Sequence, residues 1–593
     1  MPQRQETSGN RRLPVQASTR FDVGWFQTRM AEGARKQAGL GWLLGSGLIG
    51  LVVLSPVLAL LVLALQGSGD LWPHLLAFVL PQALATSMLL LAGVGVMVMS
   101  IGTLTAWLVT AYDFHGRRWL EWALLLPLAM PTYIIAYSYL DLLHPIGPLQ
   151  TGLRQMLGYT SPRELLLPDI RSLGGCILLF GFVLYPYVYI STRAMFHMQM
   201  ASFVEVAHTL GAGRIGVFFK VALPLARPAI AVGTSLALME ALNDVGASEF
   251  LGVRTITVSI YTTWINRSNL GGAAQIALLM LVVVIALVLV ERYARRHRHY
   301  AGSGKQGRVL ARVALTPVKG LLAILACAIP VCLGFVLPVA YLVVEAATRL
   351  RDFGLSPDII SQTLHSVGVA GLATVLALAL GLVMAFTVRQ GKTVLTQTLQ
   401  RVASFGYAVP GTVLALGLLA PLAWLDAGLE GLSHWLFGHT SGVLLFGSGA
   451  ALVTAYVVRF LTISVGGLET GFQRIPASLD QAGRTLGASP FGVLRRIHWP
   501  LIRPALLSAG LLVFVDCMKE LPATLLLRPL NFETLATHVY GEASRGTYED
   551  GSIAALAIVL FGLVPVILIA EFGKSRQTVT HSTQSTDQPD ART

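Results

Sequence analysis

The sequence is poor in charge for its length. Of its 593 residues, only 12% are charged and 54% are apolar, whereas ordinary globular proteins carry about 25% charged residues. A soluble chain of this size would divide into several domains, each with a charged exterior. This composition cannot supply those surfaces. It therefore excludes a soluble globular protein and indicates a membrane protein that crosses the bilayer several times.

Cysteine and the motifs of catalysis are also scarce. The four cysteines lie in apolar runs without paired spacing, which argues against a disulfide framework or a zinc site. The segment 302–306 reads Gly-Ser-Gly-Lys-Gln, but it lacks the first glycine of a phosphate-binding loop and has Gln where that loop needs Ser or Thr. Neither HExxH nor GxSxG occurs. We therefore expect no catalytic residues, no cofactor bound by this chain and no nucleic-acid partner, and the sequence leaves any metal site unknown.

Long apolar runs are what the sequence has instead. A bilayer core about 30 Å thick needs about 20 apolar residues per helix, and twelve runs reach that length in two groups of six. The first group is 40–65, 84–111, 120–143, 173–195, 224–249 and 271–291; the second is 317–345, 363–388, 397–425, 443–468, 500–526 and 551–571. These runs predict an all-α membrane protein with about twelve transmembrane helices.

Basic residues set the expected orientation and domain layout. Lys and Arg are concentrated before the first run and between the sixth and seventh, and segments rich in them stay in the cytoplasm. We therefore expect both termini to be cytoplasmic and lipid to surround the spans. The predicted layout is a tail at 1–39, a first half at 40–300, a cytoplasmic linker at 301–316, a second half at 317–573 and a tail at 574–593. Both tails have a composition typical of disorder.

The two halves are copies of each other. A shift of 276 residues aligns 205–229 with 481–505 and gives 11 identities in 25 positions, where composition alone gives about two. A shift of 279 aligns upstream residues, among them Pro131 with Pro410. Each copy has an even number of spans, so both enter and leave the membrane on the same side. We expect two parallel six-helix repeats related by an axis along the membrane normal.

Each repeat carries a short cytoplasmic segment, 202–224 in the first copy and 478–500 in the second. Both begin with Ser-x-x-Glu/Gln, a capping-box pattern that predicts the start of a short helix. Gly211 and Gly487 then favour a left-handed C-terminal turn, and the proline that closes each segment predicts the start of the next membrane helix. The chain would present two copies of a helical elbow, although an interfacial amphipathic loop without a partner fits the same pattern.

These elbows resemble the cytoplasmic loop signature of binding-protein-dependent ABC import permeases. The signature is Glu-x-Ala-x-x-x-Gly, nine residues, an aliphatic residue, a spacer and Leu-Pro. The second copy departs from it with Gln481 and Gly483, and because Gln serves a capping box as well as Glu, we assign Glu205 and Gln481 a structural role. The ATPase-coupling residues that the resemblance implies are Glu205, Ala207, Gly211, Leu223, Pro224, Gln481, Gly483, Gly487 and Pro500.

The resemblance covers about residues 40–575 and implies a fold, partners and a cargo. The fold would be that of a type I ABC importer permease in the bacterial inner membrane. Helices 202–211 and 478–487 would dock on two copies of a cytoplasmic ATPase that binds ATP and magnesium, and an extracytoplasmic binding protein would deliver the cargo. Both halves in one chain, with the segments 185–189 and 518–535, resemble the fused permeases for ferric iron. Thiamine, sulfate, polyamines and phosphonates stay open as alternatives.

Four carboxylates stand at equivalent places inside the predicted spans. Glu240 and Asp244 recur, after the shift of 276, as Asp516 and Glu520. Ionisable groups in a membrane are costly and usually face a cavity, and oxygen ligands suit a hard cation such as Fe(III). Glu240 lies about 24 Å of helix rise beyond the proline that opens its span, which predicts a position near the outer mouth. The candidate pathway residues are Glu240, Asp244, Asp516, Lys519 and Glu520.

Other interpretations stay open at this point. The acids could form structural ion pairs with Lys519 and Arg528, and the three tyrosines of the segment 185–189 could be packing or interface aromatics. A secondary transporter with parallel halves could use the carboxylates as proton sites. A membrane-embedded enzyme is disfavoured, because no nucleophile with an adjacent base is visible.

Overall fold

The computed structural model describes residues 40–159, 161–295, 312–438 and 444–584. Within this part of the chain, eleven helices are long and apolar enough to cross a membrane. A bent pair of helices, 117–129 and 132–142, meets at 92° and makes a twelfth crossing if it counts as one span. The all-α architecture with eleven to twelve spans agrees with the prediction. The tail at 1–39 and most of the linker lie outside the described residues.

The elements of the first half follow the predicted spans with several interruptions. In chain order they are α2 (Leu40–Leu65), α3 (Leu71–His74), η1 (Leu75–Val79), α4 (Leu80–Ala111), β1 (Tyr112–Asp113), α5 (Arg117–Ala123), η2 (Leu126–Ala129), α6 (Thr132–Leu142), α7 (Pro148–Leu157), α8 (Leu173–Thr209), α9 (Arg214–Val217), η3 (Phe218–Ala222), α10 (Leu223–Asn243), α11 (Gly246–Phe250), α12 (Ile256–Ile265) and α13 (Leu270–Arg295).

The second half repeats this series with different helix lengths. Its elements are β2 (Val313–Ala314), α14 (Pro317–Val331), η4 (Cys332–Val336), α15 (Leu337–Phe353), α16 (Asp358–Gln390), α17 (Val394–Ala403), η5 (Gly406–Ala408), α18 (Gly411–Phe437), α19 (Gly449–Gln473), α20 (Ala477–Thr485), α21 (Pro490–Val493), η6 (Leu494–His498), α22 (Trp499–Met518), α23 (Pro522–Leu527), α24 (Leu535–Arg545) and α25 (Tyr548–Gln584). Helix α25 reaches into 574–593, where the sequence predicted a disordered tail.

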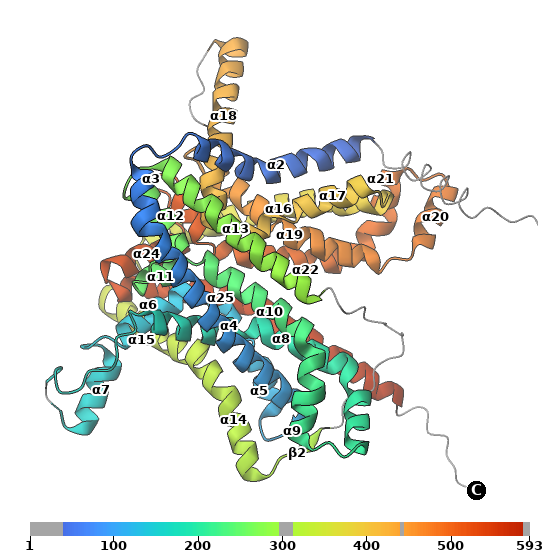
Figure 1. Cartoon of the computed structure of the whole chain (residues 1–593). Helices are drawn as coiled ribbons and strands as arrows, with labels where there is room; N and C mark the ends of the chain where they lie inside the picture. The colour runs from blue at the N-terminus through green and yellow to red at the C-terminus, as the bar shows by residue number, and fades with distance from the viewer. Residues whose placement is uncertain (1–39, 160, 296–311, 439–443, 585–593) are drawn as a thin grey trace, which may run out of the picture.

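The first span of each half packs against the other half. Helix α2 contacts α16, α17 and α18, and Ser46 on α2 donates a hydrogen bond to Thr387 over 2.9 Å. In return, α14 and α15 contact α5, α6 and α8, and the Tyr341 hydroxyl donates to Asp141 over 2.6 Å. Figure 1 shows α2 lying beside α16 and α17 of the second half. Within its own half α2 contacts α13. The two halves predicted from the repeat are therefore consecutive in the chain, but each packs its first span against the other half.

Several spans that the sequence predicts as continuous are broken at equivalent places. Pro131 and Pro410 have extended backbone and precede α6 and α18, so the runs 120–143 and 397–425 each bend there. Proline disfavours helical backbone in the residue before it, which explains the break. The runs 224–249 and 500–526 are broken too, because α10 and α22 end before the short helices α11 and α23 begin.

The predicted capping boxes are wrong in both elbows. In the first copy, position 202 lies inside α8, which runs without interruption to Thr209, so there is no helix start to cap. In the second, α20 begins after Pro476 and has no side-chain cap. The predicted prolines do stand in the first turn of the next helices, because Pro224 and Pro500 are the second residues of α10 and α22. Each enters through a π-helical turn, η3 or η6, just before it; the wider turn accommodates the missing N–H and the ring.

The predicted glycine turns are confirmed. Gly211 and Gly487 both have φ +80°, a conformation that costs residues with a Cβ free energy. In each copy the next residue, Ala212 or Ala488, donates its N–H to the carbonyl five positions earlier over 3.0 Å, as in a Schellman motif. The two elbows therefore end with the same backbone turn, although their helices begin differently.

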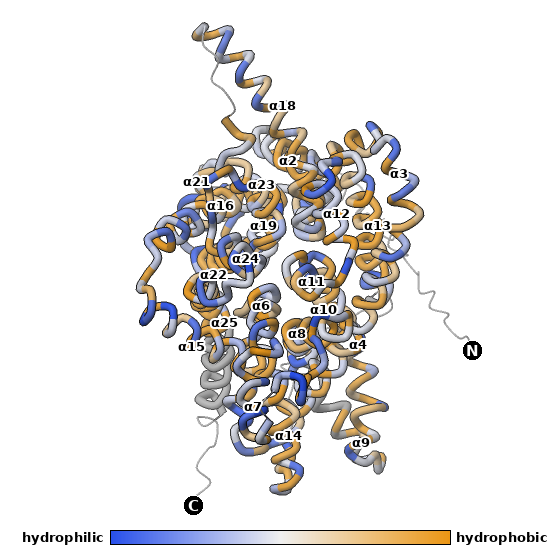
Figure 2. The backbone as a smooth tube through the Cα atoms, turned by 90° about the vertical axis from the view of Figure 1, so that its left-hand side faces the viewer, coloured by the Kyte–Doolittle hydropathy of each residue, from blue (hydrophilic) through white to orange (hydrophobic). Residues whose placement is uncertain are grey.

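Both elbows lie at one end of the molecule. Figure 1 shows α20 and the turn between α8 and α9 on the side away from α11 and α24. Figure 2 views the molecule from the opposite end, with α11 near the centre and apolar residues along α4 and α13. Exposed apolar side chains such as Val96 and Val282 lie on these outer helices, as expected for contact with lipid. The common end is required for parallel repeats.

Candidate functional site

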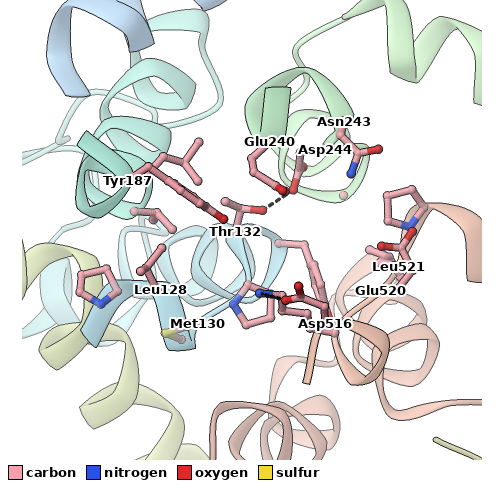
Figure 3. Close-up of a pocket in the computed structure, with 18 of the residues that line it drawn as sticks. Leu128, Met130, Thr132, Tyr187, Glu240, Asn243, Asp244, Asp516, Glu520 and Leu521 are labelled. Carbon is pink, nitrogen blue, oxygen red and sulfur yellow. Dashed lines mark hydrogen bonds and ion pairs between the residues drawn. The ribbon is translucent and has the colours of Figure 1, made fainter. Parts of the chain in front are cut away.

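A cavity lies where the two halves meet, and the candidate pathway residues surround it. It encloses about 790 Å³ of empty space, including its open mouth. Figure 3 shows Tyr187 and Glu240 from the first half approaching it from one side and Asp516 from the second half approaching it from the other. The lining residues used below are Thr132, Tyr133, Tyr187, Glu240, Asn243, Asp244, Gly246, Tyr407, Arg459, Asp516, Lys519, Glu520 and Leu521.

Two of the four carboxylates hold the short helices beside the cavity. Asp244 follows the end of α10 in extended backbone, and its carboxylate accepts the N–H of Ala247 over 2.7 Å and the hydroxyl of Thr132. Glu520 likewise accepts the N–H of Ala523 over 3.1 Å. The two acids are 9% and 6% exposed. Each satisfies a backbone donor in the first turn of α11 or α23 that has no intrahelical partner.

The other two carboxylates, Glu240 and Asp516, are half-buried at the cavity. Glu240 accepts the hydroxyl of Tyr407 over 2.9 Å, and Asp516 pairs with Lys519 over 2.8 Å. Glu240 and Asp244 do not stand on one continuous helix, because α10 ends at Asn243, between them. The structure thus divides the four acids into two pairs, each related by the repeat.

Arg459 is a central residue that the sequence analysis missed. It lies in the middle of α19 with 5% of its side chain exposed, and its Nε is 3.4 Å from Glu520. Its guanidinium also donates to Asn243 of the first half over 3.3 Å. Arg459 is the single charged residue of the predicted span 443–468, and an isolated charge in a span indicates a functional site. That signal was sufficient to find it.

The alternative prediction is that Lys519 and Arg528 form structural ion pairs with the membrane acids, and it is correct for Lys519 only. Lys519 does pair with a membrane acid, Asp516. Arg528 pairs instead with Glu533 outside the spans, over 3.1 Å. Among the described residues, no group of three or more His, Cys, Asp or Glu side chains is arranged to hold a metal ion.

The two halves touch closely beside the cavity at Gly246. A Cβ at this position would lie 2.7 Å from the Cβ of Tyr133 and 2.9 Å from a methyl group of Leu521 in the second half. Helix α11 of one repeat therefore approaches the segment before α23 of the other as closely as a glycine permits. All three residues line the cavity, so this contact forms part of its wall.

The two elbows are anchored by different chemistry. In the second, the Asp480 carboxylate lies 2.8 Å from Arg389 Nε and 2.7 Å from His498 Nε2. Burial raises the pKa of Asp480, but the hydrogen bonds from Arg389 and His498 outweigh this and hold the pKa below its ordinary value. In the first elbow the equivalent positions are Val204 and Ala222, both buried.

The first elbow has aromatic packing without these charges, and equivalent rings, Phe386 and Phe472, pack beside His498 in the second. Trp107 packs its ring 5.4 Å from the rings of both Phe196 and Phe218. Of the predicted coupling residues, Ala207 and Gly483 are on the buried sides of their helices. The side chain of Glu205 lies outside the described side chains.

Comparison with known proteins agrees with this architecture. Residues 99–299 and 377–574 match the family model of the binding-protein-dependent transport system inner membrane component. The chain is 24% identical to the Fe(3+)-transport system permease protein FbpB 2 of Haemophilus influenzae over 500 residues, which cover 83% of this chain and 90% of that protein.

Two further relatives match smaller parts. The ferric transport system permease protein FbpB of Actinobacillus pleuropneumoniae is 25% identical over 63% of this chain and 54% of its own length. The molybdenum transport system permease protein ModB of Escherichia coli is 30% identical over 34% of this chain and 89% of its own length. ModB matches a segment about the size of one repeat, whereas FbpB 2 matches across both.

Proposed function

This chain belongs to the family of binding-protein-dependent transport system inner membrane components, and from the charge of its cavity and the names of two relatives we propose that it carries ferric iron. As a member it is a multi-pass, non-catalytic permease of an ABC importer, which works with an ATPase and a binding protein. The finer proposal is that ferric iron reaches the cavity from an extracytoplasmic binding protein and leaves towards the cytoplasm.

The excess of carboxylates in the cavity carries the proposal of a cationic cargo. Four acids line it, against the two cations Arg459 and Lys519, and each of these cations already pairs with an acid. Among the described residues, no ion pair joins Glu240 or Asp244 to Lys or Arg. Low-dielectric walls strengthen the field of such charges, so the cavity attracts cations and repels anions such as sulfate or phosphonates.

Two relatives support iron among the possible cations. Both the Haemophilus influenzae and the Actinobacillus pleuropneumoniae relatives are named for transport of the ferric ion, and the first aligns over most of both chains. Hard oxygen donors line the cavity and suit Fe(III). Organic cations such as thiamine and polyamines are the competitors that the experiment must exclude.

The elbows support coupling to two ATPase subunits. They lie at one end of the molecule and end in the same left-handed glycine turn. We propose that each docks on one ATPase copy, and that closure of the ATPase dimer moves α10 and α22, which begin directly after the elbows and end at the cavity. ATP and magnesium would bind the ATPase and not this chain.

Reconstitution of uptake tests the proposed function. The permease, its ATPase and its binding protein are placed in proteoliposomes, and uptake of radiolabelled ferric ion is measured with ATP, without ATP and with a proton gradient alone. We expect uptake with ATP only, and no competition by thiamine, spermidine or sulfate. Uptake driven by the proton gradient without nucleotide would favour the secondary transporter instead. Uptake of an organic cation but not of ferric ion would show that the proposed cargo is wrong.

A further inference from the structure

The cavity contains phenols as well as carboxylates, and each half contributes one of each at the half-buried positions. The first half supplies Tyr187 and Glu240, and the second supplies Tyr407 and Asp516. Among the described residues, nothing forms a hydrogen bond with the Tyr187 hydroxyl. The neighbouring tyrosines differ, since Tyr185 and Tyr189 are fully buried away from the cavity. The sequence could not separate these three tyrosines, whereas the structure directs Tyr187 alone to the cavity.

A third phenol indicates that the cavity receives an occupant with oxygen atoms. Tyr133 lines the cavity with 3% of its surface exposed, and its hydroxyl has no hydrogen-bond partner. A buried hydroxyl without a partner costs free energy, and such a group in a cavity points to a bound acceptor. An oxygen ligand carried by the cargo, such as water, would accept from it.

We propose that the cavity is a transient ferric-ion site whose protein ligands are two carboxylates and two phenolates. The ligands are Glu240, Tyr187, Asp516 and Tyr407. This inference rests on the proposed function and specifies how the cargo is held. Oxygen-only donors favour a hard trivalent ion, and drawing two ligands from each half would make affinity depend on how closely the halves approach.

The existing contacts of these ligands can be exchanged for bonds to the ion. Asp516 and Lys519 are 22% and 31% exposed at the cavity, so water and an incoming ion reach both groups. The single hydrogen bond between Tyr407 and Glu240 is replaced when both oxygens bind the ion. Each phenol loses its proton to cavity water as its Fe–O bond forms and regains a proton when the ion leaves. Iron stays Fe(III) throughout, so no reductant is needed.

Phenolate ligation has an optical signature that tests the site directly. The complex of permease and ATPase is placed in lipid nanodiscs and titrated with ferric nitrilotriacetate, and the visible phenolate-to-iron charge-transfer band is recorded with equilibrium binding of radiolabelled iron. We expect a band in the natural protein and a weaker one in Tyr187→Phe and in Tyr407→Phe. The double variant should have none. Affinity should fall by at least about tenfold in each single variant, a loss typical when groups at a metal site are removed.

Matched variants separate ligation from misfolding. Tyr185→Phe removes a buried hydroxyl that also lacks a partner but does not line the cavity, and it should keep the full band. Assembly with the ATPase should be unchanged in every variant. If the natural protein imports ferric ion with ATP but shows no band, or if both Phe variants keep it, the ligand assignment is wrong while the proposed function stands. If the natural protein imports no iron at all, the proposed function fails with it.

Discussion

Asp244 and Glu520 make the same contact in the two halves of the molecule: each carboxylate accepts a hydrogen bond from the backbone N–H three residues later. They stand 276 positions apart, at equivalent places in the repeat. Both lie where a membrane helix stops and a short helix begins. The duplication has therefore preserved a helix-capping contact beside the cavity, while the acids four positions earlier face the cavity itself.

Removing one of these two caps should weaken folding. Asp244→Ala leaves the Ala247 N–H without its acceptor, so we expect a loss of about 1 kcal/mol, as for other N-terminal caps. Asp244→Asn keeps an acceptor and should remain near the natural stability. Thermal unfolding of the purified protein in detergent measures both. Equal losses in the two variants would show that charge, and not the cap, stabilises α11.

Glu240→Gln should impair uptake and leave the folding stability of the protein unchanged. Its carboxylate is half-buried at the cavity and caps no helix, so we expect unfolding to stay close to that of the natural protein. Ferric uptake should fall strongly, because the cavity loses one of its two acids without a cationic partner. Uptake in proteoliposomes and thermal unfolding are compared in one preparation. Normal uptake by this variant would make Glu240 a structural group.

Substitution of the elbow glycines should uncouple the permease. Gly211 and Gly487 have φ +80°, and forcing a residue with a Cβ into that region costs about 1–2 kcal/mol. Gly211→Val and Gly487→Val should insert in the membrane but lose ATP-driven uptake. Gly216→Ala is the control, since Gly216 has no positive φ and a Cβ there meets nothing within 4 Å. Unchanged uptake in the valine variants would defeat the docking proposal.

A side chain at Gly246 should keep the two halves apart. The Cβ of Gly246→Ala would lie 2.7 Å from Tyr133 and 2.9 Å from Leu521, too close without displacement of α11. Overpacking of this kind costs about 1–3 kcal/mol. We expect lower uptake and a lower unfolding temperature. Leu521→Ala in the same chain relieves one of the two contacts and should restore part of the uptake and part of the unfolding temperature. If it restores neither, the damaging contact is the one with Tyr133, within the first half.

The second elbow should loosen only in acid. The pKa of Asp480 is held below its ordinary value in the folded protein, so its contribution to stability is fully present above the ordinary aspartate value of about 3.9 and is lost as the pH falls through the lower folded value. Asp480→Asn should be less stable than the natural protein at pH 7, and the difference should shrink below about pH 4. A constant difference down to pH 3 would contradict this assignment.

The two halves should stay associated even when the chain is divided between them, because the first span of each half packs against the other half. Helix α2 packs on the second half, and α14 with α15 packs on the first. Co-expressed chains 1–300 and 301–593 should therefore copurify. Deleting residues 1–65 from the first chain should weaken this association, because the surfaces of α16 to α18 lose their cover. Separation of the two complete fragments in mild detergent would contradict it.

Much of the architecture could be predicted because the membrane restricts the choices. Apolar runs must be helices, since unpaired backbone groups cannot be exposed to lipid, and an 11-in-25 match at a fixed shift identifies the repeat directly. The glycine turns followed from backbone sterics at Gly211 and Gly487. Local patterns failed where tertiary contacts intervened. The Ser-x-x-Glu pattern at 202 predicted a helix start, but α8 had already begun in the membrane.

The sequence by itself determined the helical class, the duplication, the two elbows and the four equivalent acids, because hydropathy, spacing and glycine sterics act locally along the chain. Only the tertiary structure decided that Asp244 and Glu520 cap helices while Glu240 and Asp516 face the cavity. It also decided that the first span of each half packs against the other half. Those assignments depend on where α10 and α22 end and on which surfaces meet across the two halves. The surfaces that meet join residues far apart in the chain, such as Tyr407 and Glu240, 167 positions apart, and no local pattern encodes such contacts.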